Sequence, residues 1–426
     1  MDTIYAPSTG LPPAAIAIVR ISGPAALAAA SALAGDLPAP REARVRTLRD
    51  PASGDLLDRA LVLVFPGPAT ATGEDLVELH LHGGRAVVAA VEAALAARAG
   101  LRRADPGEFT RRALANGRID LAEAEGLGDL LTAETELQRR AALAMADGAL
   151  SRRIAGWRAE LLSLAAQIEG SLDFSDEADV PAALLDDIRI HARAVAEEMA
   201  SMLAAPTVER LRDGVRVVLA GPPNSGKSTL LNVLVQREAA IVSPVAGTTR
   251  DRIEVSVARG GIPFVLTDTA GLRTATDDAI ERIGIARADE AIASADLVLW
   301  LGDDAPPAPS MLWLHTRADL AGRAATPLGP DIAVSAMQPE SVEALWDVVA
   351  DRAAQLIPKP GELALNARQA EHCWAAVEAL GEVESPDELI AADALRRANA
   401  ALARISGDVG VEAMLDALFG KFCIGK

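Results

Sequence analysis

Three patterns of hydrophobic and polar positions follow one another along the chain. The first 118 residues mix short apolar runs with a strict polar–apolar alternation, and this mixture predicts an α+β domain. Residues 15–21, 60–65 and 75–82 are expected to be strands, and residues 85–99 a helix.

Helical periodicity dominates from Asp120, which is placed to cap a helix, to about Glu169. After a polar break, Pro181 begins another helix. Apolar strand-like runs then alternate with helical stretches, which is typical of a doubly wound α/β domain. Its expected strands are 215–220, 252–258, 263–267, 296–301, 311–315 and 331–335.

Helical periodicity returns after Pro358 and lasts to about Phe419. The simplest interpretation is that the α/β domain is inserted into a helical domain made from both flanks. The expected organisation is a multidomain α/β and α fold with an N-terminal α+β domain at 1–118, a helical domain at 119–212 and 358–426, and the α/β domain at 213–357.

Composition narrows the class of protein. Half of the 426 residues are hydrophobic and only 3% are aromatic, which favours helices. Two cysteines do not make a disulfide framework, so a cytoplasmic location is expected. No signal peptide is expected, and no uncharged apolar run approaches the roughly 18 residues that span a bilayer. A net charge of −19 argues against coating nucleic acid by bulk electrostatics.

The segment Gly221–Ser228 reads Gly-Pro-Pro-Asn-Ser-Gly-Lys-Ser, a complete phosphate-loop motif. It follows the expected strand 215–220 and opens a helix, so that backbone N–H groups can surround a phosphate. The chain has only four lysines, which makes a chance lysine here improbable. The residues expected to contact the nucleotide are Asn224, Ser225, Gly226, Lys227, Ser228 and Thr229.

Two segments downstream fit the same site. Asp268-Thr269-Ala270-Gly271 ends the expected strand 263–267, where an aspartate holds Mg²⁺ through water and the glycine N–H reaches a γ-phosphate. Gly247–Asp251 contains threonines whose hydroxyl can join Ser228 on Mg²⁺.

Base recognition is expected at Thr316-Arg317-Ala318-Asp319, because Asp319 stands where GTPases place the carboxylate that binds guanine. The usual motif is Asn-Lys-x-Asp. Thr316 can still reach the base through its hydroxyl, and Arg317 can stack over it. Ser335-Ala336 resembles the second base-contacting loop.

Leu272 occupies the position where Ras-like enzymes carry the glutamine that orients the attacking water. Hydrolysis must therefore use another group, another chain or an ion. Glu281, Arg273 and Arg282 are the candidates in the same segment.

With these residues assembled, the chain resembles the tRNA modification GTPase MnmE (TrmE) family over essentially its whole length. The segments that carry the resemblance are Asp2–Ile4 with Ile18–Gly23, Thr72–Asp75 with His82–Gly84, Gly107–Ala113 with Asp120–Ala122, and the terminal Phe422-Cys423-Ile424-Gly425-Lys426. The resemblance implies a helical domain around an inserted Ras-like P-loop GTPase domain. It also implies a homodimer formed through the N-terminal domain.

The resemblance further implies binding of a 5-formyl- or methylene-tetrahydrofolate by Arg20, Glu78, Arg118 and Lys426. The family commonly has lysine where this chain has Arg118. Family members act with the FAD-dependent protein MnmG on C5 of the wobble uridine of certain tRNAs. Cys423 is a candidate modification thiol beside the folate, and equally a small packing residue.

For the nucleotide site, the resemblance implies GTP with Mg²⁺ on Ser228 and Thr249, and an activating K⁺ on Asn224 with oxygens of Ser243, Val245 and Thr248. Glu281 matches the glutamate that orients the water. The stretch Ser243, Pro244, Val245, Ala246, Gly247, Thr248 and Thr249 joins the GTP site.

Three alternatives remain. One is an RNA-associated switch GTPase of ribosome assembly, which would need an RNA-binding module that the acidic flanks do not contain. Another is a folate-dependent aminomethyltransferase with a regulatory G domain. A phosphate-loop ATPase is opposed by Asp319.

Overall fold

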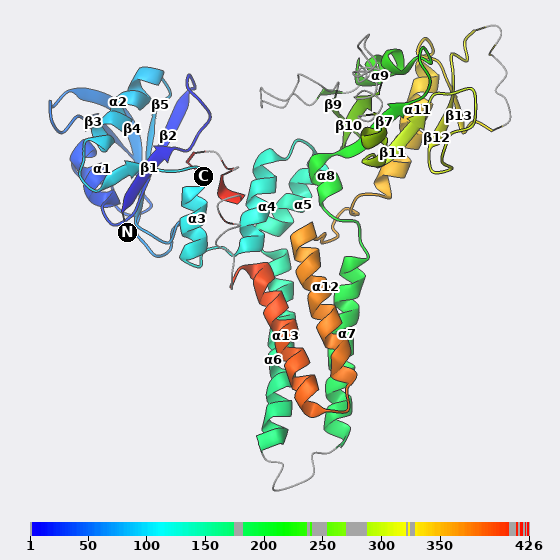
Figure 1. Ribbon diagram of the computed structural model, residues 1–426. Coiled ribbons are helices and arrows are strands. Elements are labelled where there is room, and N and C mark those ends of the chain that lie inside the picture. The colour runs from blue at the N-terminus through cyan, green and yellow to red at the C-terminus, as the bar shows by residue number, and fades with distance from the viewer. Residues whose placement is uncertain are drawn as a thin grey trace, which may run out of the picture. The chain divides into compact units, whose positions relative to one another are not determined.

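The computed structural model describes residues 2–173, 182–236, 239–240, 254–269, 288–320, 323, 329–408, 415, 418–420, 422 and 424–425. The chain divides into two compact units (Figure 1). The first unit comprises Met1–Gly128, Leu150–Ala155 and Ala403–Lys426, and the second comprises Asp129–Ala149 and Gly156–Leu402. Among the described helices, none combines the length and the apolar composition needed to cross a bilayer.

A six-stranded sheet forms the centre of the first unit. Its strand order is β3-β4-β5-β2-β1-β6, with β1 and β6 parallel and the other neighbours antiparallel. The strands are β1 (Thr3–Pro7), β2 (Ile16–Ser22), β3 (Arg44–Arg49), β4 (Leu56–Phe65), β5 (Leu76–His82) and β6 (Leu101–Arg103).

Helices contact both faces of this sheet. On one face, α1 (Ala26–Ala34) and α2 (Arg85–Ala96) share an apolar core with Tyr5, Val19 and Leu79. On the other face, Phe109 of α3 (Glu108–Ala115) packs with Ile4. The two faces follow from the strand period, because neighbouring residues such as Ile4 and Tyr5 point to opposite sides. The helix α4 (Leu121–Thr132) follows α3.

The sequence predicted β2, β4, β5 and α2 but not β1, β3 or β6. Four consecutive residues of β1 are buried, so the strand shows no polar–apolar alternation. The edge strand β3 carries arginines at three of its positions and buries only Leu48. β4 begins at Leu56, earlier than the expected residue 60, because Asp58 and Arg59 separate its first two leucines from the apolar run.

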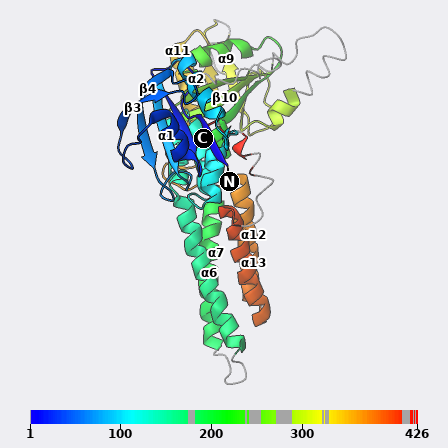
Figure 2. The ribbon, with the colours of Figure 1, turned by 90° about the vertical axis from the view of Figure 1, so that its left-hand side faces the viewer.

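The second unit contains the α/β domain and helices that precede and follow it in the sequence. The described helices outside the α/β domain are α5 (Glu136–Ala146), α6 (Ala149–Asp173), α7 (Ala182–Leu203), α8 (Glu209–Asp213), α12 (Ala367–Gly381) and α13 (Glu388–Ser406), with the 3₁₀ turn η2 (Glu382–Glu384). Residues Leu150–Ala155 of α6 and the last residues of α13, from Ala403, belong to the first unit. Figures 1 and 2 show α7 and α12 side by side.

Polar contacts join the helices from the two flanks. Trp157 Nε1 of α6 donates to Glu198 Oε2 of α7 at 2.9 Å, and Arg158 Nε donates to Asn399 Oδ1 of α13 at 3.2 Å. At the other end, Val208 N donates to Leu365 O at 3.1 Å, so the chain enters and leaves the α/β domain side by side. The α/β domain is therefore inserted into a helical bundle, as predicted.

A seven-stranded sheet forms the α/β domain, with strand order β13-β12-β11-β7-β10-β9-β8. The strands from β13 to β10 are parallel, and β9 and β8 are antiparallel at one edge. They are β7 (Val215–Ala220), β8 (Ala239–Ala240), β9 (Glu254–Arg259), β10 (Ile262–Asp268), β11 (Leu297–Trp300), β12 (Leu312–Thr316) and β13 (Ile332–Val334). Each predicted strand lies within two residues of an observed one.

The core of this domain packs around Phe264 of β10 and Trp346 of α11 (Pro339–Ala354), whose ring centroids are 5.2 Å apart. The helix α9 (Lys227–Gln236) adds Leu230, Leu231 and Leu234 to the same core. Because each of these side chains is almost fully buried, the core holds β7 and α9 in a fixed relation.

Candidate functional site

The loop Gly221–Gly226 connects the central strand β7 to α9. β7 lies between β10 and β11, where the strand order reverses, and ligands of doubly wound sheets bind beyond the carboxyl ends of the strands at such a point. Gly221 has a φ of +144°, and a Cβ there would lie 2.7 Å from Leu301 O. Only glycine lets the loop leave the sheet so close to β11.

Lys227 lies at the start of α9 and is almost fully buried. Its Nζ donates to Gly221 O at 3.0 Å and to Pro222 O at 2.7 Å, so the ammonium group sits within the loop. Asn224 at the tip of the loop has a left-handed φ of +61°. A buried cation beside the backbone N–H groups of a helix start is suited to anionic oxygens.

Ser228 and Asp268 bring oxygen atoms together beside this loop. Ser228 Oγ donates to the carboxylate of Asp268, which is buried at the end of β10. The next residue, Thr269, is held on β7 because its Oγ1 donates to Leu219 O at 2.9 Å. A hydroxyl and a carboxylate are ligands that suit Mg²⁺, directly or through water.

The ends of β12 and β13 form the third part of the site. Ser335 Oγ donates to Asp319 Oδ1 at 2.5 Å, which orients that carboxylate. Thr316 Oγ1 donates to Ser225 O at 3.2 Å, and Arg317 Nη2 donates to Asn224 O. The two residues that replace Asn-Lys therefore contact the phosphate loop. Stacking over a base stays a prediction for the Arg317 stem.

The structure thus brings together the predicted residues of the loop, of the β10 end and of the β12 and β13 ends. Thr229 is exposed in the first turn of α9, and Ala336 lies in the turn after β13. The predicted residues outside the described ones are Ser243, Pro244, Val245, Ala246, Gly247, Thr248, Thr249, Ala270, Gly271, Glu281, Cys423 and Lys426.

A second polar cluster lies in the sheet of the first unit. Arg20 of β2 and Glu78 of β5 are paired in register, and Arg20 Nη2 donates to Glu78 Oε1 at 2.8 Å. His80 Nε2 lies 3.3 Å from Glu78 Oε2, and Arg20 Cζ lies 5.8 Å from the centre of the Phe109 ring. The Arg20, Glu78 and His80 side chains are half-buried, whereas the Phe109 ring is buried. The cluster offers a cation and a carboxylate to one ligand.

The described residues of the C-terminal tail contact the segment that follows β1 and the segment that precedes α3. Ile424 forms an antiparallel bridge with Pro106, and Ser8 Oγ donates to Gly425 O at 2.9 Å. Ser8 follows β1, in which Ala6 is the register partner of Arg20. The tail and the Arg20–Glu78 pair, distant in sequence, therefore lie near the same strand end.

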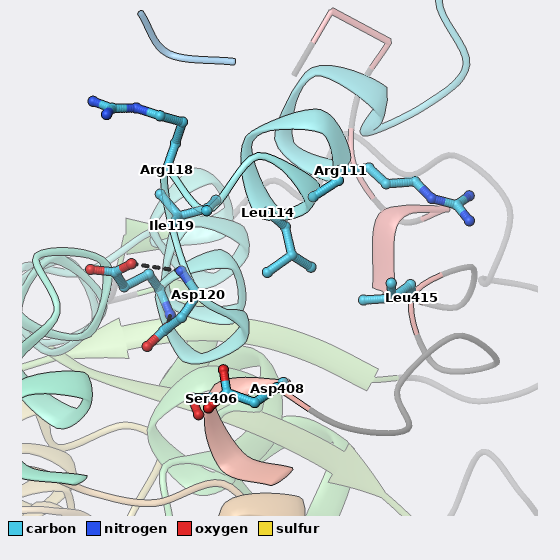
Figure 3. A pocket seen from close by; sticks show the side chains of 12 residues that line it. Arg111, Leu114, Arg118, Ile119, Asp120, Ser406, Asp408 and Leu415 are labelled. Atoms are coloured by element: carbon cyan, nitrogen blue, oxygen red, sulfur yellow. Dashed lines mark hydrogen bonds between the residues drawn. The ribbon is translucent and has the colours of Figure 1, made fainter. Parts of the chain in front are cut away.

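Arg118 contacts the loop between β4 and β5. Its Nε donates to Thr70 O at 3.1 Å. Arg118 also lines a cavity of about 480 Å³, together with residues of α3, α4 and the end of α13. Figure 3 shows Leu114, Asp120 and Leu415 around this cavity, whereas the Arg118 side chain extends away from it. The cavity is therefore not the place to which Arg118 brings its charge.

Known proteins resemble the chain along its full length. The model described as GTP-binding protein TrmE N-terminus matches residues 3–118, and the MnmE helical domain model matches residues 121–423. The tRNA modification GTPase MnmE of Erythrobacter litoralis is 55% identical over 428 residues, which cover 100% of both chains. The chain belongs to the MnmE family.

A second MnmE relative, from Novosphingobium aromaticivorans, is 53% identical over 436 residues that cover 100% of both chains. Among solved structures, the G domain of the T. maritima FeoB iron transporter is 25% identical and covers 33% of this chain and 98% of its own, with a TM-score of 0.24. Membership of the MnmE family thus rests on the full-length relatives.

This MnmE-family chain also contains an ion-pair network that the sequence did not predict. Arg112 contacts Asp2 at 2.7 Å, Glu108 at 3.0 Å and Glu74 at 3.2 Å, and Arg102 pairs with Asp2 and Glu108 as well. Four of these five residues belong to the segments that carried the resemblance, but pairing between such distant positions is not visible in a sequence.

The charges of this network are mutually stabilising. Burial favours the neutral form of Glu108, but hydrogen bonds from Arg102, from the backbone N–H of Asp105 and from Arg112 outweigh it and lower the pKa of Glu108. His80 was also missed. The period-two alternation that puts Glu78 and His80 on one face of β5 was the available signal.

Proposed function

We propose that the chain is a K⁺-dependent GTP hydrolase that acts with the FAD-dependent MnmG on tRNA. Together they modify C5 of the wobble uridine (U34) to (carboxymethyl)aminomethyluridine, using a one-carbon unit of tetrahydrofolate. The observation that carries this proposal is the phosphate loop with its buried Lys227 at the strand-order reversal, in a chain 55% identical over its full length to a tRNA modification GTPase.

GTP binding is supported by the contacts around the loop. Lys227 would exchange its bonds to the Gly221 and Pro222 carbonyls for phosphate oxygens, which are stronger acceptors because they are charged. Asp319, oriented by Ser335, would accept the N1 and N2 protons of guanine. An adenine in that place presents no matching donors.

Two ions belong to the proposal. Ser228 and Thr249 would hold Mg²⁺, which the Ser228–Asp268 oxygen pair suits. Asn224, with Ser243, Val245 and Thr248, would hold K⁺. The cations would supply positive charge beside the β- and γ-phosphates. Glu281 would orient the attacking water, the role that Leu272 cannot fill.

The one-carbon site is proposed at Arg20 and Glu78, with Arg118 and Lys426. A folate carries carboxylates and a pterin edge with N–H donors, and a half-buried arginine–carboxylate pair beside Phe109 offers partners to both. Gly425, which precedes Lys426 in the sequence, is docked against Pro7. Cys423 remains either a modification thiol or a packing residue.

A homodimer formed through the N-terminal domain and a cytoplasmic location complete the proposal. Kinetics of GTP hydrolysis in K⁺ and in Na⁺, at several protein concentrations, test its centre. The rate should be higher in K⁺ and rise with concentration if pairing of G domains is needed. Equal rates in both salts would remove the K⁺ assignment.

Glu281→Ala tests the water-orienting role separately. GTP binding should remain within about threefold of the wild-type value, because no direct contact to the nucleotide is proposed for Glu281, while turnover falls about 100-fold or more. Turnover at the wild-type rate would exclude Glu281. Loss of U34 modification in a reconstituted reaction without MnmG, and its return with MnmG, would separate this function from an autonomous aminomethyltransferase.

A further inference from the structure

The last residues of the chain pack onto the first unit at several separate points. The Phe419 and Phe422 rings lie 5.7 Å apart and join Ala124 in a buried cluster. Beyond them, Ile424 bridges to Pro106. We call the described residues 418–420, 422 and 424–425 the strap.

Two glycines mark places where the strap touches other backbone. Gly107 has a φ of +68°, and a Cβ there would lie 2.7 Å from Phe419 O. Gly425 in the strap has a φ of +97°, and a Cβ there would lie 2.0 Å from Pro7 O. Real Cβ contacts essentially never fall below 3.0 Å, so both positions exclude every residue with a side chain.

Gly425 is also held by a hydrogen bond that leads toward the Arg20–Glu78 pair. Its carbonyl accepts from Ser8 Oγ at 2.9 Å, and Ser8 N donates to Ile18 O of β2 at 2.7 Å. Arg20 lies two residues further along β2. The backbone around Gly425 is therefore tied to the strand that carries Arg20.

We propose that Gly425 is a positioning residue, which docks the strap on Pro7 and Ser8 and thereby completes the ligand site at Arg20 and Glu78. The ligand class, a reduced folate, rests on the function proposed above; the docking does not. A ligand at the half-buried pair gains from a wall that excludes water, because charge-assisted hydrogen bonds strengthen away from solvent. In this proposal the docked strap supplies that wall.

Gly425→Ala tests the docking, and Gly54→Ala is its matched control. Gly54 has a φ of +77° but meets nothing within 4 Å of a new Cβ, so the control carries the backbone strain without the steric clash. Hydrogen–deuterium exchange of the peptide that contains Phe422 reports docking directly. Its exchange should accelerate tenfold or more in Gly425→Ala and less than twofold in Gly54→Ala.

Ser8→Ala serves as a milder second variant, since it removes only the hydroxyl that holds the Gly425 carbonyl. It should accelerate the same exchange about two- to tenfold, the effect of one hydrogen bond. It leaves the backbone of Gly425 unaltered and so remains informative if Gly425→Ala fails to fold.

Titration with 5-formyltetrahydrofolate measures the second part of the proposal. The dissociation constant of 5-formyltetrahydrofolate should rise tenfold or more in Gly425→Ala, while the affinity for GDP should not change. Wild-type exchange in Gly425→Ala would overturn the docking. Faster hydrogen–deuterium exchange in Gly425→Ala together with a wild-type dissociation constant for the folate would show that strap docking does not affect the ligand site at Arg20 and Glu78. A wild-type chain that binds no folate, yet shows the exchange effect, would refute the proposed ligand and leave the docking intact.

Discussion

Arg317 offers a direct test of how the base-binding end supports the phosphate loop. Its guanidinium donates to Asn224 O, while Thr316 holds the neighbouring Ser225 O. Arg317→Ala removes the first contact, and Arg317→Met removes it but keeps an apolar stem that can still stack on a base. The pair of variants separates support of the loop from stacking.

The expected loss of GDP affinity depends on how exposed the Arg317 side chain is. Arg317 is exposed, so its hydrogen bond belongs at the low end of the range, about 0.5–1 kcal/mol. GDP affinity should therefore fall about two- to fivefold in both Arg317→Ala and Arg317→Met, since 1.4 kcal/mol corresponds to tenfold. Adding Thr316→Ala should bring the loss to about 5- to 30-fold, because both contacts to the loop are then gone.

The assay is displacement of a fluorescent GDP by unlabelled GDP and by IDP, whose base lacks the 2-amino group. The ratio of the two affinities should not change in the Arg317 variants, because Asp319 is oriented separately by Ser335. Asp319→Asn is the control and should collapse that ratio. Wild-type GDP affinity in Arg317→Met, together with a loss in Arg317→Ala, would refute the role at the loop and establish stacking.

Three further outcomes are expected. Arg112→Met should lower the free energy of unfolding of the first unit by about 3 kcal/mol, because the largely buried Glu74 and Glu108 carboxylates lose an ion-pair partner and only Glu108 keeps Arg102. The pKa of Glu108 is lowered in the folded chain, so ionised Glu108 stabilises the fold at pH values above its pKa in the unfolded chain, and this stabilisation is lost as the pH falls through its pKa in the folded chain. The difference between the free energies of unfolding measured by urea titration at pH 7 and at pH 4 should therefore be smaller in Arg112→Met than in the wild type. His80→Ala should weaken 5-formyltetrahydrofolate binding several-fold in a titration, and His80→Gln, which keeps a donor for Glu78, should restore most of it. Burial raises the pKa of the Cys373 thiol to about 11. In a Cys423→Ala variant, where Cys373 is the remaining cysteine, labelling by a disulfide reagent should therefore be slow at pH 8 and become faster as the pH rises. Rapid labelling at pH 8 would contradict the burial of Cys373.

The sequence was most informative where one element dictates its own pattern. β7 was predicted at its observed bounds because a central parallel strand is a continuous apolar run, and the loop after it needs glycines at fixed places. β1 was missed because it is buried on both faces, and so lacks the alternation that reveals a strand.

Contacts between distant segments could not be predicted from the residues alone. The Arg112 network joins positions from Asp2 to Glu108, and nothing in its local sequence indicates which charges meet. The contact of Arg317 with Asn224 depends on two left-handed backbone positions, at φ +57° and +61°, in loops separated along the chain. Such conformations are uncommon for residues other than glycine and are decided by the surrounding fold.

The hydrogen bond between Val208 N and Leu365 O brings the two ends of the inserted α/β domain together, which makes this domain genetically separable from the helices that flank it. Backbone atoms 3.1 Å apart can be bridged by two or three glycines, at about 3.3–3.6 Å per residue, so a shortened gene that omits the intervening residues would still encode continuous helices on either side. Recombination at this junction could replace one nucleotide-driven module by another without disturbing the bundle that receives it.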